Sequence, residues 1–170
     1  MPPSPLPGQK KGHDIHEPSD HALGLSRGGI GTKLHLAVEK RGLPLGFILT
    51  RGNAHEAPLF EPLMAQARMA RPQLGLPARL AADKAYVSGD IDTWLRRRRI
   101  QRLIPPKSNR QAPMSWTATQ KKGYRGRNVV ERCVGKLKEF RRLATRYEKL
   151  ALNFGGMVIL GMIVLYLRAL

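Results

Sequence analysis

The segment from Tyr124 to Lys138, YRGRNVVERCVGKLK, constrains the fold more than any other part of the chain, because it reads as one amphipathic helix. Successive helical residues turn by about 100°, which gathers four polar residues within an arc of about 60°: Tyr124, Arg127, Glu131 and Lys138. A separate apolar stripe lies about 110° away and comprises Val130, Cys133, Val134, Leu137, Phe140 and Ala144. We therefore expect a helix that buries one side and presents Glu131 between cations on the other.

Glu131 has two interpretations on charge alone. In the first, Arg127 and Glu131 form an ordinary i,i+4 pair on a solvated helix face. Such a pair contributes only about 0.2–0.5 kcal/mol, and Arg preceding Glu is the weaker orientation. In the second, the carboxylate belongs to a functional site that the neighbouring cations help to build. The charges by themselves favour the first interpretation.

The spacing Tyr-x2-Arg-x3-Glu-x6-Lys favours the second interpretation. It resembles the signature around the catalytic glutamate of bacterial insertion-sequence transposases of the DDE type. Four residue types at three fixed intervals make a fairly specific match, and the residues that follow, FRRLATRYEKLALNF, continue to resemble that family. The resemblance covers the chain from about Leu23 to its C-terminus and implies that it is the catalytic part of such a transposase.

A second informative stretch, RLAADKAY from Arg79 to Tyr86, places Asp83 directly after a short apolar run. This pattern is typical of a strand that delivers a carboxylate at its C-terminal end, where ligands bind in open α/β sheets. An aspartate after a strand is also a common helix cap, and the segment alone favours that role. The resemblance implies a catalytic role, because the family carries its second catalytic aspartate in an Asp-Lys-Gly-Tyr context. Ala85 departs from that context, which matters if its backbone requires a positive φ.

The remaining pattern predicts an α/β domain. Residues 32–39 alternate with Leu34 and Leu36 on one face and His35 on the other, and residues 44–50 supply the second strand of a hairpin. We treat His35 as structural or solvated. Further elements are expected in chain order. They are a helix over 54–70, which Pro62 either kinks or delays, a helix over 88–99, a strand over 102–104, an exposed basic loop over 107–123 and a helix over 148–170 that is buried against the sheet or a partner. The resemblance implies a ribonuclease-H-like mixed sheet with flanking helices.

The amino-acid composition indicates which class of partner the chain binds. The 170 residues include 30 Lys plus Arg against 12 Asp plus Glu, a formal charge of +18 that is spread along the chain. This excess predicts a polyanionic partner, and nucleic acid is the leading candidate, although RNA-binding proteins share the same balance. The single cysteine, Cys133, excludes an internal disulfide and fits a reducing cytoplasm. No signal peptide is evident, and the apolar run 157–167 is too short to span a bilayer, so no membrane role is expected.

The resemblance implies a specific chemistry. Asp83 and Glu131 would bind Mg²⁺ or Mn²⁺, because hard cations prefer oxygen ligands. Supporting or DNA-binding roles would fall to Tyr124, Arg127, Lys138 and Lys84. The implied reaction is cleavage at the terminal inverted repeats, followed by transfer of the 3′-hydroxyl into target DNA. The implied partners are the element ends, target DNA and further copies of the chain, in the cytoplasm at the bacterial nucleoid.

One departure from the family pattern bears on activity. The family needs a third carboxylate, an aspartate near the end of a first strand, and the only candidates, Asp14 and Asp20, follow no apolar β-like run. Residues 1–29 are rich in proline and read as an irregular basic segment, which leaves residues 30–170 as a partial catalytic domain. We expect an incomplete metal site and an unpaired strand edge, as in a split-frame or truncated transposase. The alternatives are a catalytically inactive DNA-binding remnant and an unrelated RNA-binding protein.

Overall fold

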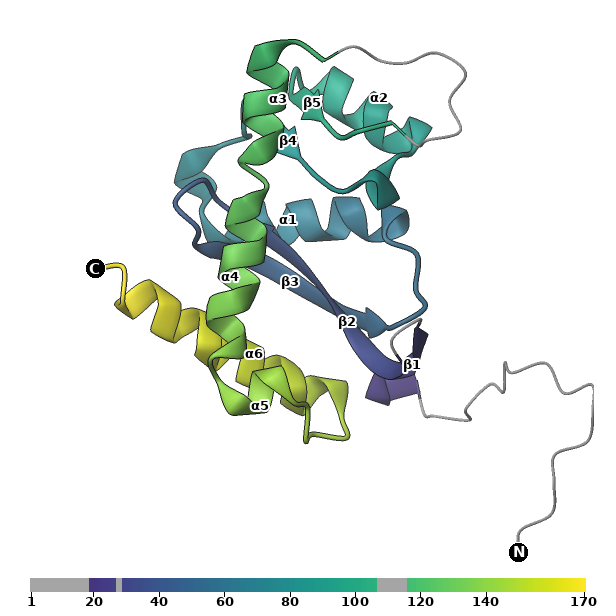
Figure 1. Cartoon of the computed structure of the whole chain (residues 1–170), viewed down its shortest axis with the longest axis vertical. Coiled ribbons are helices and arrows are strands. Elements are labelled where there is room, and N and C mark those ends of the chain that lie inside the picture. Colours follow the sequence, from purple (N-terminus) through teal and green to yellow (C-terminus); the bar gives the residue numbers. More distant parts are fainter. Residues whose placement is uncertain (1–18, 27–28, 107–115) are drawn as a thin grey trace, which may run out of the picture.

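The computed structural model describes residues 19–26, 29–106 and 116–170, which form a mixed α/β structure with two separate sheets (Figure 1). The strands are β1 (Gly24–Ser26), β2 (Gly29–Val38), β3 (Pro44–Arg51), β4 (Arg79–Ala81) and β5 (Gln101–Leu103). The α-helices are α1 (Phe60–Ala70), α2 (Gly89–Arg97), α3 (Ala118–Arg125), α4 (Asn128–Lys138), α5 (Arg141–Ala144) and α6 (Ala151–Leu167), and short 3₁₀ helices include η1 (Ser19–His21), η2 (Ala57–Leu59), η3 (Pro72–Leu74) and η4 (Lys84–Tyr86).

The first sheet is the predicted hairpin with a short third strand added. β2 and β3 pair antiparallel from Thr32↔Arg51 to Val38↔Pro44, and the turn is closed by the Gly42 amide, which donates to the Glu39 carbonyl at 2.8 Å. Gly42 has a φ of +88°, a conformation that favours glycine. β1 lies in the segment that we expected to be irregular, and it pairs with the first residues of β2 only.

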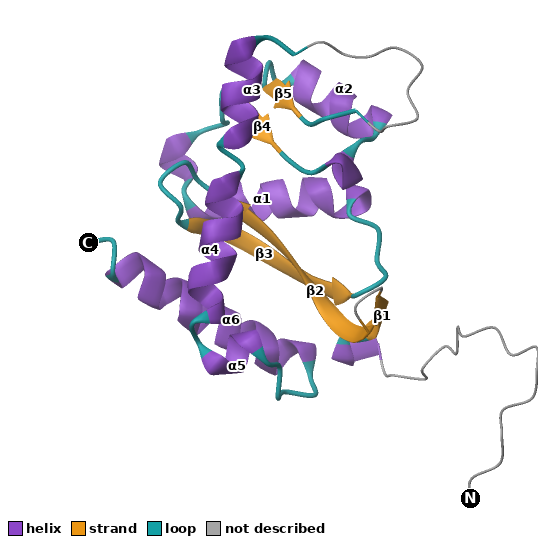
Figure 2. Ribbon diagram, in the orientation of Figure 1, coloured by secondary structure: helices purple, strands orange, loops and turns teal. Residues whose placement is uncertain are grey.

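Helices cover both faces of the hairpin (Figure 2). The alternation predicted for β2 holds: Leu34, Leu36 and Val38 pack against a buried cluster of Cys133, Leu137 and Leu165 from α4 and α6. On the opposite face, α1 lies close to β3, where a Cβ on Gly46 would come within 3.0 Å of the Gln66 side chain. Cys133 and Leu137, which belong to the apolar stripe predicted for this helix, are therefore buried against the sheet.

The second sheet and α2 share a core with α1. β4 and β5 pair in parallel, and the cluster beside them comprises Phe60, Ile91, Leu95, Ile100 and Ile104. Phe60 comes from the start of α1 and meets the Trp94 ring edge to face at 5.2 Å. Because α1 also packs on β3, it connects the two sheets. The predicted late start of this helix is confirmed, since η2 precedes it and Pro62 lies in its first turn, where a missing N–H is tolerated.

Two expectations about the segment before Glu131 were wrong. Of the exposed loop expected over 107–123, residues 107–115 lie outside the described residues, and residues 118–123 belong to α3, which begins with a capping box of Thr117 and Gln120. The single helix expected over 124–138 is interrupted between α3 and α4. Tight i→i−3 hydrogen bonds of 3.1 and 2.9 Å join Gly126 to Gly123 and Arg127 to Tyr124. A Cβ on Gly126 would lie 2.9 Å from the Gly123 carbonyl oxygen, so this turn requires glycine.

The C-terminal helix is shorter than expected. α6 begins at Ala151 and buries Phe154, Val158, Gly161 and Leu165, whereas the opposite side exposes apolar residues such as Leu152 and Ile163. Burial within the chain is therefore confirmed for one side of the helix, and burial of the other side against a partner stays a prediction. None of the helices in the described part of the chain is long and apolar enough to cross a membrane.

Two hydrogen bonds of His35 join β2 to its neighbours. The ring is 4% exposed, with Nδ1 3.1 Å from the Tyr86 hydroxyl and Nε2 2.9 Å from Thr50 Oγ1. Tyr86 ends η4, directly after the second sheet, so this contact links the two sheets. Burial, and secondarily the charge of Lys33, lowers the pKa of His35. Of the two expected roles, structural or solvated, burial and these hydrogen bonds favour the structural one, at a place next to the cavity beside Asp83.

Truncation of the shared core will test how much stability it contributes. Leu95 is 1% exposed, so Leu95→Ala should lower the free energy of unfolding by about 2–5 kcal/mol through lost burial and a residual cavity. Leu152→Ala is the matched control, because Leu152 is 84% exposed and its truncation should change stability by less than about 0.5 kcal/mol. Urea denaturation measures both. Equal losses would contradict the assignment of this cluster as a core.

The lowered pKa of His35 predicts an acid sensitivity with a definite sign. The unfolded chain binds a proton at His35 near the ordinary pKa of 6.5, and the folded chain resists it, so folding stability should fall as the pH drops below about 6.5. The melting temperature of the unsubstituted chain should fall between pH 8 and pH 5, and the fall should be smaller in His35→Gln. His55→Gln, at an exposed histidine, should behave like the unsubstituted chain. An unchanged pH profile in His35→Gln would contradict the assignment.

Candidate active site

Asp83 lies two residues beyond the C-terminal end of β4, as the sequence predicted. Its backbone is extended, and its Oδ1 accepts a hydrogen bond of 2.6 Å from the Lys84 amide at the start of η4. Asp83 is thus both the residue after a strand and the cap of the following turn. Ala85 lies in η4 and is not among the non-glycine residues with positive φ, which in the described chain are Ala22 and Arg99. The alanine therefore brings no backbone strain.

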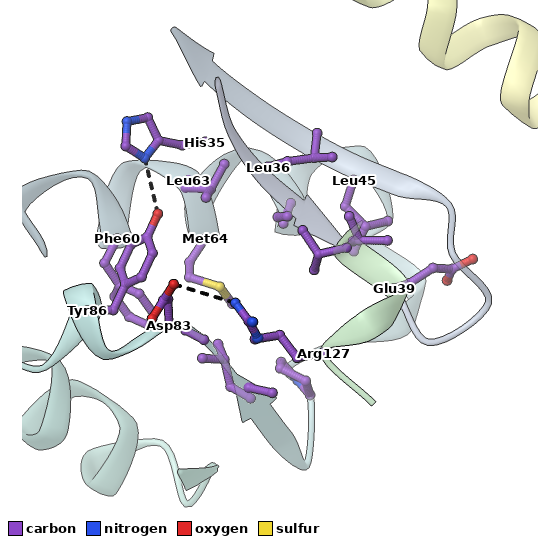
Figure 3. A pocket seen from close by; sticks show the side chains of 18 of the residues that line it. His35, Leu36, Glu39, Leu45, Phe60, Leu63, Met64, Asp83, Tyr86 and Arg127 are labelled. Carbon is purple, nitrogen blue, oxygen red and sulfur yellow. Dashed lines mark hydrogen bonds and ion pairs between the residues drawn. The ribbon is translucent and has the colours of Figure 1, made fainter. Parts of the chain in front are cut away.

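Arg127 connects Asp83 to Glu131. Its guanidinium lies 3.5 Å from Asp83 Oδ2 through Nη1 and 2.9 Å from Glu131 Oε1 through Nη2, and Figure 3 shows the first of these ion pairs. The two carboxylates come from the second sheet and from α4. Their side chains are 53% and 60% exposed, so each keeps contact with water. The structure therefore brings these two distant residues together around one cation.

The supporting residues predicted from the sequence separate into two groups. The guanidinium of Arg127 lies 5.6 Å from the centroid of the Tyr124 ring, and that ring meets Trp116 at 5.0 Å, so Tyr124 belongs to the site. Lys84 is exposed beside Asp83. Lys138 is exposed at the end of α4, two helical turns or about 10 Å along the axis from Glu131. It is therefore not part of the cluster around Arg127.

Sequence reasoning missed Tyr86 as a neighbour of the site. Burial, together with the nearby charges of Glu56 and Asp83, raises the pKa of Tyr86 to about 12. The phenol therefore stays protonated at neutral pH and can hydrogen-bond to His35. Its place three residues after Asp83 was visible in the sequence, but no pattern indicated that His35 on a distant strand would contact it.

A cavity of about 600 Å³ lies beside these residues, between β2 and β4 (Figure 3). Its walls come from β2, α1, the segment from β4 to η4, and α4. Asp83, Arg127 and Glu131 are among its lining residues, and so are Leu36, Met64 and other apolar side chains. The site thus combines two carboxylates and a cation with a largely apolar hollow.

The chemical type of the side chains at this site suits a hard divalent cation. Asp83 and Glu131 offer carboxylate oxygens, the ligands that Mg²⁺ and Mn²⁺ prefer, and Arg127 would have to release at least one of them. Across residues 19–26, 29–106 and 116–170, no three His, Cys, Asp or Glu side chains gather into a metal-binding group. Asp20 lies in η1 and does not line the cavity, and Asp14 is outside the described residues. The described part of the chain therefore brings two carboxylates, those of Asp83 and Glu131, to this site.

Comparison with known proteins identifies the family of this chain. Residues 4–167 match the family described as the transposase DDE domain. The chain is also 28% identical over 140 residues to the predicted transposase of insertion sequence element IS6501 from Brucella ovis, an alignment that covers 81% of this chain and 98% of that protein. No solved structure gives a significant match. The family match spans nearly the whole sequence, and the chain therefore belongs to the DDE transposases of insertion sequences.

Proposed function

We propose that this chain catalyses phosphoryl transfer on DNA, with Asp83 and Glu131 as its catalytic carboxylates. The observation that carries the proposal is their convergence on Arg127 from separate elements, in a chain of the transposase family. The order of hairpin, helix, strand, helix, strand and helices is that of the later part of a ribonuclease-H-like domain, which we assign to residues 30–170. Residues 1–29 then form a segment that leads into this domain and contributes β1 to its first sheet.

Each residue of the cluster has a chemical role in this proposal. Asp83 and Glu131 would hold Mg²⁺ or Mn²⁺, which supplies charge stabilisation and lowers the pKa of bound water. Arg127 would bind a DNA phosphate once a carboxylate releases it, because its planar guanidinium suits bidentate contacts with phosphate. Tyr124 would keep Arg127 in place through its ring. Lys84 and Lys138 would contact phosphates as point charges away from the reacting bond.

The proposed reaction has two phosphoryl transfers. In the first, an oxygen of water forms a bond to the phosphorus at an element end, and the 3′-oxygen of that end leaves as a hydroxyl. In the second, this 3′-hydroxyl attacks a phosphodiester in target DNA and displaces a target 3′-oxygen. Both steps place negative charge on the phosphate oxygens, which nearby cations stabilise.

The surface of the chain suits a nucleic-acid substrate. Exposed cations lie on α2, α3 and α4 and include Arg96, Arg97, Lys121, Lys122, Arg125, Arg132 and Lys136. Together with the net charge of +18, they support DNA binding that is driven by phosphate contacts and weakens with salt. The exposed apolar side of α6 supports self-association, because such patches often mark protein interfaces. A DNA substrate would place the protein at the nucleoid.

Two carboxylates are fewer than the three that the family pattern requires. We propose that the third is supplied by a segment encoded in an upstream frame, as expected of a split or truncated transposase gene. The two sheets support this proposal, because β2 and β4 each keep a strand edge without a partner among the described strands. Open edges of this kind are what the loss of a first strand would leave.

A second candidate function is DNA binding without catalysis. It is favoured by one observation: Arg127 already pairs with both carboxylates, and no third acidic side chain joins them in the described structure. A remnant of this kind would bind DNA through its cations and would differ from the active enzyme in the absence of cleavage. Substitution of either carboxylate would then leave every DNA-related property unchanged.

Excision of the element in cells will test the proposal. A plasmid carries the complete element with its native flanking DNA, and the gene for this chain is changed to Asp83→Asn or Glu131→Gln. Each change keeps the size of the side chain and removes the charge of one oxygen ligand. Loss of a group that only orients a metal ligand already lowers activity by about 10- to 100-fold. Loss of a ligand itself should therefore lower excision by more than about 100-fold. Excision is counted by restoration of a reporter gene.

Matched controls use carboxylates outside the site. Asp90→Asn on α2 and Glu61→Gln on α1 change exposed residues in the first turns of their helices and should leave excision within about twofold, with at most a small loss of helix stability. Excision by the site variants at the level of the controls would contradict the catalytic assignment. An unsubstituted element that never excises, while the purified chain binds DNA in a salt-dependent manner, would establish the inactive remnant instead.

A further inference from the structure

The outer side of α6 is an apolar surface that the proposed chemistry does not use. α6 lies at the edge of the molecule, and one of its sides is buried (Figure 1). At about 100° per residue, the exposed apolar residues fall on the opposite side, within an arc of about 100°. Their large side chains are between 48% and 84% exposed. We call this surface the α6 stripe, and it comprises Leu152, Gly156, Ile159, Leu160, Ile163 and Leu167.

The α6 stripe lies on an uncharged stretch of a strongly basic chain. The sequence from Ala151 to Leu167 contains no Asp, Glu, Lys or Arg, although the net charge of the whole chain is +18. Two copies of such a chain repel each other unless they meet where charge is absent. Arg168 follows the helix directly, and it pairs with Glu139 of its own copy at 3.1 Å. The α6 stripe is therefore a place where two copies can approach closely.

The chain itself has no further segment of suitable composition to cover the stripe. Residues 1–18, 27–28 and 107–115 lie outside the described part of the structure. Of the residue types Leu, Ile, Val and Phe, these segments contain only Leu6 and Ile15. Two apolar residues that lie far apart in the sequence cannot cover five large exposed side chains. An occupant of the stripe must therefore come from another polypeptide.

The α6 stripe is symmetric about the middle of its helix, which makes it complementary to itself. We consider two α6 helices that lie antiparallel, with a two-fold axis between residues 159 and 160. Each member of the stripe then faces another member on the second copy, as a two-fold interface requires. The pairs are Leu152 with Leu167, Gly156 with Ile163, and Ile159 with Leu160.

Gly156 gives this pairing its closest approach. A Cβ at this position would meet nothing within 4 Å in its own copy, so the glycine leaves open space on the surface of α6. In the antiparallel pair, the side chain of Ile163 from the second copy fills that space. A small residue opposite a large one lets the two helices interdigitate, as the ridges and grooves of packed helices do.

We propose that α6 binds the α6 of a second copy of this chain in an antiparallel pair, through the α6 stripe. This orientation places the positive end of each helix dipole beside the negative end of the other. The inference deepens the proposed self-association and rests on that part of the proposed function. It does not depend on the catalytic carboxylates.

The exposed area of the stripe predicts a weak, reversible dimer. Each large aliphatic side chain carries roughly 100 Å² of apolar surface, so the exposed parts supply on the order of 300 Å² per copy. Because about two-thirds of a homodimer interface is apolar, the whole contact covers roughly 500 Å² per copy. A total of about 1,000 Å² is near the lower limit for a specific interface, and we expect a dissociation constant on the order of 10 μM.

Sedimentation equilibrium of the full chain will test the inference without DNA. In about 0.5 M NaCl, which screens the net charge, the chain should change from monomer to dimer between about 1 and 100 μM. Ile159→Glu brings two carboxylates close to the two-fold axis and should weaken the dimer by at least about tenfold. Met69→Glu is the matched control, because Met69 is 81% exposed on α1, and it should leave the dissociation constant unchanged.

Gly156→Leu separates specific packing from general stickiness. The added side chain has space in the monomer and suits a helix better than glycine, so the variant should fold at least as stably. It should nevertheless weaken the dimer by at least about tenfold, because it occupies the space that Ile163 of the second copy needs. Non-specific association through apolar surface would strengthen instead, and that result would overturn the inference.

Chemical cross-linking will test the orientation of the pair. With a short bismaleimide, Leu160→Cys should link two copies, because residue 160 lies beside the two-fold axis. Leu152→Cys should not, because its two copies lie about 22 Å apart along the helices. The natural Cys133 is 1% exposed and should not react.

The outcomes of these tests separate the inference from the catalytic proposal. A chain that stays monomeric at about 100 μM would overturn the inference and would leave the stripe to a different polypeptide. Equal cross-linking of Leu152→Cys and Leu160→Cys would contradict the antiparallel pair. A dimer that behaves as expected, in an element that never excises, would support the inference and reject the catalytic proposal alone.

Discussion

The candidate site depends on one guanidinium. Arg127 lies in the tight turn between α3 and α4, and its two ion pairs reach Asp83 after β4 and Glu131 in the first turn of α4. Two carboxylates brought this close would repel each other without a cation between them. In the described structure Arg127 occupies that position, and in the proposed reaction a divalent metal would take it over. The same contact fixes the second sheet against the helix that covers the first.

The two sheets are held together by side chains and not by a strand. Phe60 packs into the core of the second sheet from the helix that covers the first, and His35 contacts Tyr86 across the gap. Phe60, His35 and Tyr86 all line the cavity between β2 and β4. These side chains therefore fix the distance between the two sheets and shape the cavity beside Asp83 and Glu131.

Local sequence patterns predicted most helices and strands, whereas contacts between distant segments could not be predicted from them. The alternation of residues 32–39, the late start forced by Pro62 and the position of Asp83 after a strand all follow from steric and periodic rules that act within a few residues. α3 was missed because its basic residues suggested a solvated loop, although Thr117 and Gln120 carried the capping signal. The contact of His35 with Tyr86, and the sharing of Arg127 by two carboxylates, arise from packing of distant segments that no local pattern specifies.

The most direct test of the account is whether Asp83 and Glu131 bind the same metal ion. Titration of the full chain with Mn²⁺, followed through the EPR signal of the free ion, reports binding without requiring DNA or turnover. The account predicts a site whose affinity falls by at least about tenfold in both Asp83→Asn and Glu131→Gln, and not in Asp90→Asn. Binding that survives unchanged in either site variant would show that the two carboxylates do not share a metal, and would contradict the central claim.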